Sequence, residues 1–319
     1  MSTEVNGCRA TNSIFEEAWW LDAVAPGKWR CLEVKDGNGI LIGRWPICFG
    51  KILGFKTIRN PKYTQTLGPW IKNDSKSYTK YLSNKKNVLE ELIKQLPRKP
   101  YNVFLTLDSS NEYILPFRWR GFTYSPTFSY RFSNLKDIEE IFNNMDSKRR
   151  KRILKASKNL LVRDDYPLDV LFSMMQKSND RQKRNKKIDI EAIIRIDKAC
   201  IAHNARKFLV AIDQDGNIHA AKYLVYDDRV CYDLLGGADP VYRSSDAQSL
   251  LMWESIKFAS TVSEAFDMEG SNVEYIEQNF RSFGSPFVVN YEVKRLNLFL
   301  ALADAFAIMV KKHILKQHV

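Results

Sequence analysis

Cysteine is scarce in this sequence, and the spacing of the few cysteines disfavours two kinds of site. The 319 residues hold five of them, Cys8, Cys31, Cys48, Cys200 and Cys231. Their number is odd, they lie far apart, and none forms a Cys-x-x-Cys pair. A disulfide framework and a zinc site are therefore disfavoured, and we expect free buried thiols in a reducing compartment and no bound metal.

Segments typical of export or of membrane crossing are also missing. The first residues show no basic stretch followed by an apolar one, so we expect a cytoplasmic protein. The apolar stretch 296–310 contains Asp304 and is short for a spanning helix, so we expect no transmembrane segment. Three alternatives remain for this stretch: packing on its own domain, packing on a second copy in a homodimer, or a membrane-surface contact helped by Lys311 and Lys312.

Acidic residues are outnumbered, which leaves a formal net charge of +12. This charge fits a nucleic acid, an anionic membrane or phosphorylated small molecules as partners, or a basic surface without a single role. The sequence shows no helix-turn-helix, zinc-finger or RNP aromatic pattern, so nucleic acid is not part of the leading interpretation. An apolar fraction of 45% is ordinary for a chain with a real core.

The order of predicted elements suggests two similar halves. Each half begins with a helix, followed by a hairpin whose turn is rich in glycine and asparagine, at residues 36–39 and 214–217. Further strands and helices follow in both halves, and a pair of helices near residues 135–161 separates them. We therefore predict two domains, residues 1–145 and 146–319.

Residues 231–284 are the most informative stretch. Their pattern predicts a strand, a glycine turn, a polar loop, a buried helix, a second strand and a second helix. A strand that leads into a helix through a short polar loop leaves backbone N–H groups free at the helix N-terminus, and such a site attracts phosphate. We expect a phosphorylated acyl carrier to bind here.

An ordered set of segments carries a resemblance to a known fold. The chain resembles the acyltransferases of the GNAT fold, in particular the tandem-GNAT branch related to the FemAB peptidyltransferases. The segments that carry the likeness are residues 65–70, the helix 149–158, Gly236-Gly237, Tyr242-Arg243, residues 266–271 and Phe283-Gly284. The resemblance implies an α+β fold of two tandem GNAT-like domains, each a mixed twisted sheet flanked by helices.

Within this branch the chain looks most like the sugar-nucleotide N-acyltransferases. That likeness implies transfer of a short hydroxyacyl group, such as 3-hydroxybutanoyl, from coenzyme A to the amine of a dTDP-linked 3-amino-3,6-dideoxyhexose for O-antigen or capsule biosynthesis. Two rivals are a FemAB-type aminoacyl transferase, which takes aminoacyl-tRNA and a peptidoglycan or glycan acceptor, and a non-catalytic polyanion-binding protein. The net charge favours both rivals, but the sequence has no long heptad run of the kind that FemAB-type proteins often carry.

The resemblance also implies where coenzyme A binds. A strand that ends at Gly236 would bind the pantetheine arm through its backbone, and the loop that follows would meet the diphosphate. The expected cofactor-binding residues are Leu235, Gly236, Gly237, Tyr242, Arg243, Ser244, Ser245, Ala247 and Ser271. From the residues alone, Ser244 or Ser245 could equally be the N-cap of the next helix.

Amide formation from a thioester requires a base for the amine, and three residues are candidates. The sequence contains no Gly-x-Ser-x-Gly motif, which agrees with direct attack without a covalent enzyme intermediate. Strand alternation would place Asp267 and Glu269 on one face, where two neighbouring carboxylates raise the pKa of one of them. Glu269 is the first choice as base, Asp233 the second and His219 the third, with a water-relayed base as the alternative.

Aromatic and basic residues are candidates for binding the acceptor. The loop 63–70 mixes aromatic and hydrogen-bonding side chains, as a ligand wall does, although a packed connector would have the same composition. Lys155 shares one side of a helix with Arg152, where a diphosphate could be clamped, and a solvated basic face is the alternative. The expected substrate-binding residues are Trp19, Tyr63, Gln65, Trp70, Arg149, Arg152 and Lys155.

Overall fold

The computed structural model describes residues 4–5, 8–97, 101–182, 187–270 and 274–316, and its chain falls into two compact units. Unit 1 comprises Met1–Asn12, Ala25–Pro126 and Asn290–Val319, and unit 2 comprises Ser13–Val24 and Thr127–Val289. Each unit therefore takes in segments that are distant in the sequence. The division into domains at residue 145 stays a prediction, because compactness alone does not define a GNAT-like domain.

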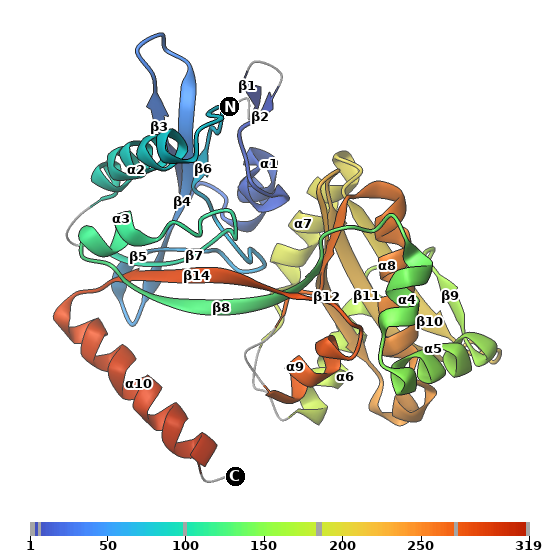
Figure 1. Cartoon of the computed structure of the whole chain (residues 1–319). Coiled ribbons are helices and arrows are strands. Elements are labelled where there is room, and N and C mark those ends of the chain that lie inside the picture. The colour runs from blue at the N-terminus through green and yellow to red at the C-terminus, as the bar shows by residue number, and fades with distance from the viewer. Residues whose placement is uncertain (1–3, 6–7, 98–100, 183–186, 271–273, 317–319) are drawn as a thin grey trace. The chain divides into compact units, whose positions relative to one another are not determined.

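Unit 1 is built on a mixed sheet (Figure 1). Its strands run in the order β3-β4-β5-β7-β14, with β6 paired to β4, and β5 and β7 are parallel while the other pairs are antiparallel. A separate small sheet pairs β1 with β2. The strands are β1 (Glu4–Val5), β2 (Cys8–Arg9), β3 (Trp29–Lys35), β4 (Leu41–Ile52), β5 (Phe55–Arg59), β6 (Trp70–Ile71), β7 (Asn102–Leu107) and β14 (Phe287–Arg295). The helices are α2 (Tyr78–Gln95), α3 (Leu115–Trp119) and α10 (Leu298–Lys316).

Local chemistry explains several boundaries in unit 1. The Asp36 carboxylate accepts hydrogen bonds from the backbone N–H groups of Asn38 and Ile40, both at 2.9 Å, which closes the predicted hairpin turn between β3 and β4. Helix α2 begins at Tyr78, because the Ser77 hydroxyl accepts from the N–H of Lys80 and caps the helix there.

Unit 2 is also a mixed sheet with helices packed against it. Its strands run in the order β8-β13-β12-β11-β10-β9, and the β12–β13 pair is parallel while the others are antiparallel. The strands are β8 (Thr123–Phe132), β9 (Leu161–Arg163), β10 (Arg206–Ile212), β11 (Ile218–Tyr226), β12 (Val230–Ala238) and β13 (Ala265–Asp267). The helices are η1 (Ile14–Glu16), α1 (Ala18–Val24), α4 (Ile138–Asn144), α5 (Ser147–Asn159), α6 (Asp169–Arg181), α7 (Ile190–Ala202), η2 (Pro240–Ser245), α8 (Ala247–Val262) and α9 (Glu274–Arg281).

Helix α8 is the centre of the core of unit 2. Leu251, Ile256 and Ala259 are fully buried on it, and they join a cluster that includes Phe266 of β13 and Ile153 of α5. Burial of a leucine or isoleucine side chain contributes about 1.5–3 kcal/mol, so these contacts fix α8 firmly against the sheet. The start of α8 is thereby held at a defined place beside the end of β12.

The expected fold class is confirmed: the chain is α+β, with mixed sheets flanked by helices. Within the described ranges, no helix combines the length and the apolar character that crossing a bilayer requires.

Candidate functional site

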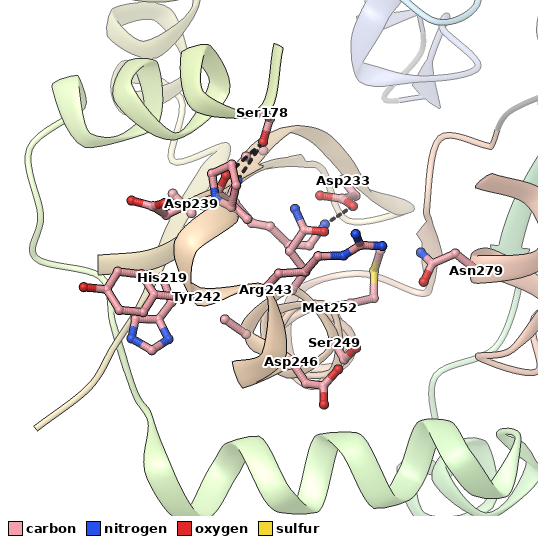
Figure 2. A pocket seen from close by; sticks show the side chains of 18 of the residues that line it. Ser178, His219, Asp233, Asp239, Tyr242, Arg243, Asp246, Ser249, Met252 and Asn279 are labelled. Carbon is pink, nitrogen blue, oxygen red and sulfur yellow. Dashed lines mark hydrogen bonds and ion pairs between the residues drawn. The ribbon is translucent and has the colours of Figure 1, made fainter. Parts of the chain in front are cut away.

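Unit 2 contains a pocket of about 510 Å³ at the end of β12 (Figure 2). Residues 233–239 of β12 and of the turn after it form one wall, and η2 with the first turn of α8 forms another. Side chains from α5, α6, β11 and α9 complete the lining. The pocket therefore lies where the sequence predicts the strand, the polar loop and the helix N-terminus.

The backbone of β12 changes its pairing at this pocket. Leu234 is bulged out of the pairing with β11, because Tyr223 lies opposite Leu235 while the next residue, Leu224, lies opposite Asp233. On its other side, β12 pairs with β13 only along Val230–Tyr232 in the described part of the chain. From residue 233 onward, that edge of the strand borders the pocket instead of a neighbouring strand.

The loop after β12 leads directly into α8. The N-cap of α8 is Asp246, in the left-handed conformation with φ 58°, and its carbonyl accepts from the N–H of Ser249 at 2.9 Å. The alternative of Ser244 or Ser245 as N-cap is therefore wrong. The Ser245 hydroxyl instead accepts a long hydrogen bond of 3.4 Å from the N–H of Ala247.

Most of the expected cofactor-binding residues line the pocket. Ser244 lies in a neighbouring open depression shared with Arg152 and Arg243, and Ser245 lines neither hollow. Ser271 lies outside the described residues. The residues that line the pocket are Leu235, Gly236, Gly237, Tyr242, Arg243 and Ala247.

Gly237 has a packing role that the sequence does not reveal. A Cβ atom at this position would lie 2.2 Å from the carbonyl oxygen of Met174 in α6. The glycine is thus required for the close approach of α6 to β12. At Gly236 the nearest atom, the carbonyl oxygen of Ala221, would be 3.0 Å away, so the clash is milder there.

The pocket wall carries more positive than negative charge. Its basic side chains are Arg149, Arg152, Arg181, Lys222 and Arg243, and its acidic ones are Asp233, Asp239 and Asp246. Each of these acids has a basic partner, respectively Lys222, Lys177 and Arg152, the last at 3.8 Å. Arg181 and Arg243 have no acidic partner within the described ranges, so the wall keeps positive charge available for an anionic ligand.

Asp233 lines the pocket beside the bulge. Its Oδ2 is ion-paired with Lys222, which is itself almost buried on β11 (Figure 2). Its other oxygen, Oδ1, is buried and has no hydrogen-bond partner among the described residues. Of the three predicted candidate bases, Asp233 is the one that lies at the point where β12 and β13 separate.

Glu269 does not line the pocket, although it lies near Asp233. Strand β13 ends at Asp267, and Glu269 has φ 50°, so the expected alternation of these two residues on one strand is wrong. Its Oε1 is buried without a hydrogen-bond partner in the described part of the chain. Burial, followed by the charges of Asp267 and Asp233, raises the pKa of Glu269 well above its ordinary value.

Asp267 serves the structure around β13. Its carboxylate is fully buried, accepts a hydrogen bond from the Ser129 hydroxyl and forms an ion pair of 2.8 Å with Arg131 Nε. It also accepts from the backbone N–H of Glu269 at 2.7 Å. These bonds tie β13 to β8 and hold the backbone of Glu269 in its left-handed conformation.

His219 lies at the loop end of the pocket, at the start of β11. Its ring stacks on the ring of Tyr242 with centroids 4.1 Å apart, and its Nε2 is 3.1 Å from Asp213 Oδ2 (Figure 2). Hydrogen bonds from Asn217, followed by the bond to His219, lower the pKa of Asp213 to about 2. This arrangement braces η2 against β11.

The three basic residues expected to bind substrate occupy different environments on α5. Arg149 is buried, and its guanidinium donates to the side chains of Ser282, Ser249 and Asn279 at 2.9, 2.5 and 2.5 Å. It therefore joins α5 to α8 and α9 at the pocket wall. Arg152 is exposed at the pocket mouth, and Lys155 is exposed outside the lining.

The four other residues expected to bind substrate do not line this pocket. Trp19, in unit 2, stacks on His203 with ring centroids 4.4 Å apart. Tyr63, Gln65 and Trp70 belong to unit 1. Tyr63 has φ 62°, a conformation that is uncommon for a bulky residue.

Several lining residues are absent from the sequence prediction. They include Ser178, Arg181, Lys222, Asp239, Asn279 and Phe280. The sequence could have indicated Lys222 as a site residue, because it is a charged residue in the middle of a largely apolar strand. Ser178 had none, since its hydroxyl meets both the N–H and the carbonyl of Ala238 across the fold, at 2.9 and 3.2 Å.

A family comparison agrees with the position of the pocket. Residues 147–275 match the family model described as an acetyltransferase (GNAT) domain. This stretch of the chain is thus similar to a GNAT domain. The matched range contains β12, η2 and α8, and hence most of the pocket wall. No curated protein matches the sequence.

Solved structures share the fold at low sequence identity. FemX has a TM-score of 0.69 at 12% identity, and the match covers 91% of this chain and 94% of FemX. A conserved protein of unknown function from Bacteroides thetaiotaomicron VPI-5482 has a TM-score of 0.56 at 12% identity, covering 88% and 90%. The C-terminal domain of a putative lysylphosphatidylglycerol synthetase from Agrobacterium fabrum has a TM-score of 0.52 at 11% identity. The match covers 87% of this chain and 89% of that domain.

Proposed function

We propose that this protein is an N-acyltransferase that takes its acyl group from coenzyme A in the pocket of unit 2. One observation carries the proposal: the stretch similar to a GNAT domain coincides with a pocket bordered by the bulged, partly unpaired end of β12. A strand edge without a neighbour presents backbone donors and acceptors, as the amide groups of a pantetheine arm require.

The diphosphate of coenzyme A would meet η2 and the first turn of α8. The N-terminus of this 16-residue helix carries partial positive charge, and Arg243, Arg152 and Arg181 add full charges at the same end of the pocket. Arginine suits this role because its planar guanidinium binds phosphate oxygens in pairs.

In the proposed reaction the acceptor amine attacks the thioester carbonyl carbon. A C–N bond forms, the C–S bond breaks, and coenzyme A leaves as the thiolate. The amine proton passes to a base, for which we propose Asp233, directly or through one water. Glu269 lies nearby but outside the pocket lining, and burial raises its pKa well above the ordinary value.

For the acceptor we retain the amine predicted from the sequence, that of a dTDP-linked 3-amino-3,6-dideoxyhexose, with 3-hydroxybutanoyl as a candidate acyl group. This choice rests on the sequence resemblance alone. Lys155 on α5 of unit 2 is a proposed acceptor-binding residue.

The FemAB-type alternative, aminoacyl transfer from aminoacyl-tRNA, is the second candidate. The likeness to FemX over almost the whole of both chains and the net charge of +12 favour it. Both donors also carry phosphate groups, to which the positive wall of the pocket is complementary.

Thiol release tests the proposal directly. The protein is incubated with a panel of acyl-CoA thioesters and with dTDP-amino sugars as acceptors, and parallel reactions use labelled aminoacyl-tRNA. Acceptor-dependent thiol release supports the proposal, and transfer only from tRNA supports the second candidate. If neither reaction occurs, a non-catalytic polyanion-binding protein is the remaining interpretation.

A variant at the pocket then tests where the donor binds. Arg243→Ala should raise the KM for acyl-CoA about ten-fold with little change in the KM for the acceptor, because one charge-assisted contact with phosphate is lost. Arg163→Ala is the matched control, since Arg163 is an exposed arginine on β9 that pairs with Asp165 away from the pocket. An equal effect of both substitutions would place the donor elsewhere.

A further inference from the structure

Helix α10 of unit 1 (Figure 1) has one side in contact with β14 and another side whose apolar side chains are exposed. On its inner side Leu300 is 3% exposed, and Asp304 accepts from Lys294 Nζ of β14 at 3.0 and 3.1 Å. On the other side Leu298, Leu302 and Phe306 expose 78%, 63% and 63% of their surface. At 100° per residue these three lie within an arc of about 80°. An ordinary surface helix turns most of its apolar residues to the core, whereas α10 leaves these three exposed.

A ring contact joins α10 to the β4–β5 hairpin. Phe299 of α10 packs on Phe55 of β5, with ring centroids 5.3 Å apart. Two residues before Phe55, Leu53 occupies the turn with φ 49° and is 75% exposed. The α10 patch, defined as Leu53, Leu298, Phe299, Leu302 and Phe306, therefore spans two elements. Several exposed large apolar side chains on two elements in contact mark a contact surface.

The sequence near the α10 patch carries more basic than acidic residues. Exposed Lys51 and Lys56 stand on either side of Leu53, and the sequence from residue 51 to residue 60 contains no acidic residue. After Asp304 the sequence has lysines at 311, 312 and 316 and again no acidic residue. In a symmetric contact with a second copy, the same positive groups would face one another. An anionic surface, in contrast, would be complementary to them.

We propose that the α10 patch docks on the surface of an anionic phospholipid bilayer, with α10 lying along the interface and the tip of the β4–β5 hairpin beside it. Leucine and phenylalanine side chains enter the boundary between headgroups and acyl chains, and lysines pair with lipid phosphates. This contact does not depend on the proposed transfer reaction, because it uses no residue of the pocket.

Vesicle flotation with the full chain tests this proposal. Vesicles of neutral phosphatidylcholine are compared with mixed vesicles that also contain anionic phosphatidylglycerol, at low and high salt. Binding should require the anionic lipid and weaken with salt. The double substitution Leu302→Ser and Phe306→Ser should reduce binding about ten-fold or more, and Lys51→Gln should reduce it about five-fold.

Leu161→Ser is the matched control, since Leu161 on β9 of unit 2 is 59% exposed and lies outside the α10 patch. It should bind vesicles as the unaltered protein does, and thermal unfolding should show that all variants are folded. Equal binding by every variant, or no binding by the unaltered protein, would overturn the proposal. So would a dimer in analytical ultracentrifugation that the double substitution splits while vesicle binding is absent, because the α10 patch would then contact a second copy.

Discussion

Each unit contains a pair of parallel strands in which one strand continues after the pairing has ended. Only in unit 2 does the strand edge that is left without its partner border the pocket described above. In unit 1, β5 and β7 pair from Thr57 to Arg59, and β7 then continues to Leu107. In unit 2, β12 and β13 pair from Val230 to Tyr232, and β12 then continues to Ala238. The two unpaired strand edges have a similar backbone arrangement, but different groups lie against them.

In unit 1 the chain covers the unpaired edge of β7 with its own atoms. Asn60 accepts from the N–H of Thr106 at 2.9 Å and donates to its carbonyl at 3.2 Å. The N–H of Leu67 donates to the same carbonyl at 2.9 Å, so the loop 63–69 takes the place of a neighbouring strand. In unit 2 the corresponding edge of β12 borders the pocket. A self-filled edge cannot pair with a pantetheine arm, whereas an open one can.

The largest effect should come from the base. Asp233→Asn should lower turnover by about 100-fold or more, because the amide cannot accept the amine proton. Glu269→Gln should change turnover much less, since Glu269 lies outside the pocket lining. Steady-state kinetics of thiol release measure both. A large loss in the Glu269 variant together with a small one in the Asp233 variant would restore Glu269 as the base.

Gly237 tests the packing that shapes the pocket. Gly237→Ala should lower the free energy of unfolding by about 1–3 kcal/mol, because its Cβ would overlap the backbone of α6 at Met174. Gly236→Ala is the paired control and should lower it by less, since its nearest contact is 3.0 Å. Urea denaturation of the two variants measures the difference. Equal stability would show that α6 adjusts freely and does not need the glycine.

Asn60 tests whether unit 1 really covers the unpaired edge of β7 with its own atoms. Asn60→Ala should lower the free energy of unfolding by about 1–3 kcal/mol, because the N–H of Thr106 loses the Asn60 acceptor and the carbonyls of residues 64, 65 and 106 each lose the Asn60 donor. The KM for acyl-CoA should stay the same, since the donor pocket belongs to unit 2. A variant whose stability is unchanged and whose donor KM rises would contradict this division between the units.

The smallest effect concerns the pH dependence of stability. The pKa of Glu269 is raised in the folded chain, so the folded state binds more protons than the unfolded state above pH 4.5, the ordinary value. Its contribution to stability is therefore full below pH 4.5 and declines as pH rises toward the folded pKa. Glu269→Gln should remove this decline, which urea denaturation across the pH range measures. Parallel pH profiles for the two proteins would show that Glu269 keeps an ordinary pKa.

Local patterns in the sequence predict the hairpin turns and the order of strand, loop and helix in unit 2. The aspartate of each turn accepts bonds from residues two and four positions ahead, as Asp36 and Asp213 do, so the signal lies within a few residues. The order of elements from residue 231 to residue 284 follows from periodicity in the same way.

Features that depend on distant parts of the chain escaped prediction. The bulge at Leu234 depends on the register of β11, and the need for glycine at position 237 depends on the backbone of α6. The burial of Arg149 depends on side chains from α8 and α9 more than 90 residues away. A basic residue on a helix looks the same in the sequence whether it is solvated or holds three helices together.

A crystal structure of the protein with bound coenzyme A tests the central claim most directly. Our account predicts the pantetheine arm along residues 233–237 of β12 and the diphosphate beside Arg243 at the start of α8. Coenzyme A bound along the edge of β7 in unit 1, or with its diphosphate away from Arg243, would contradict the account.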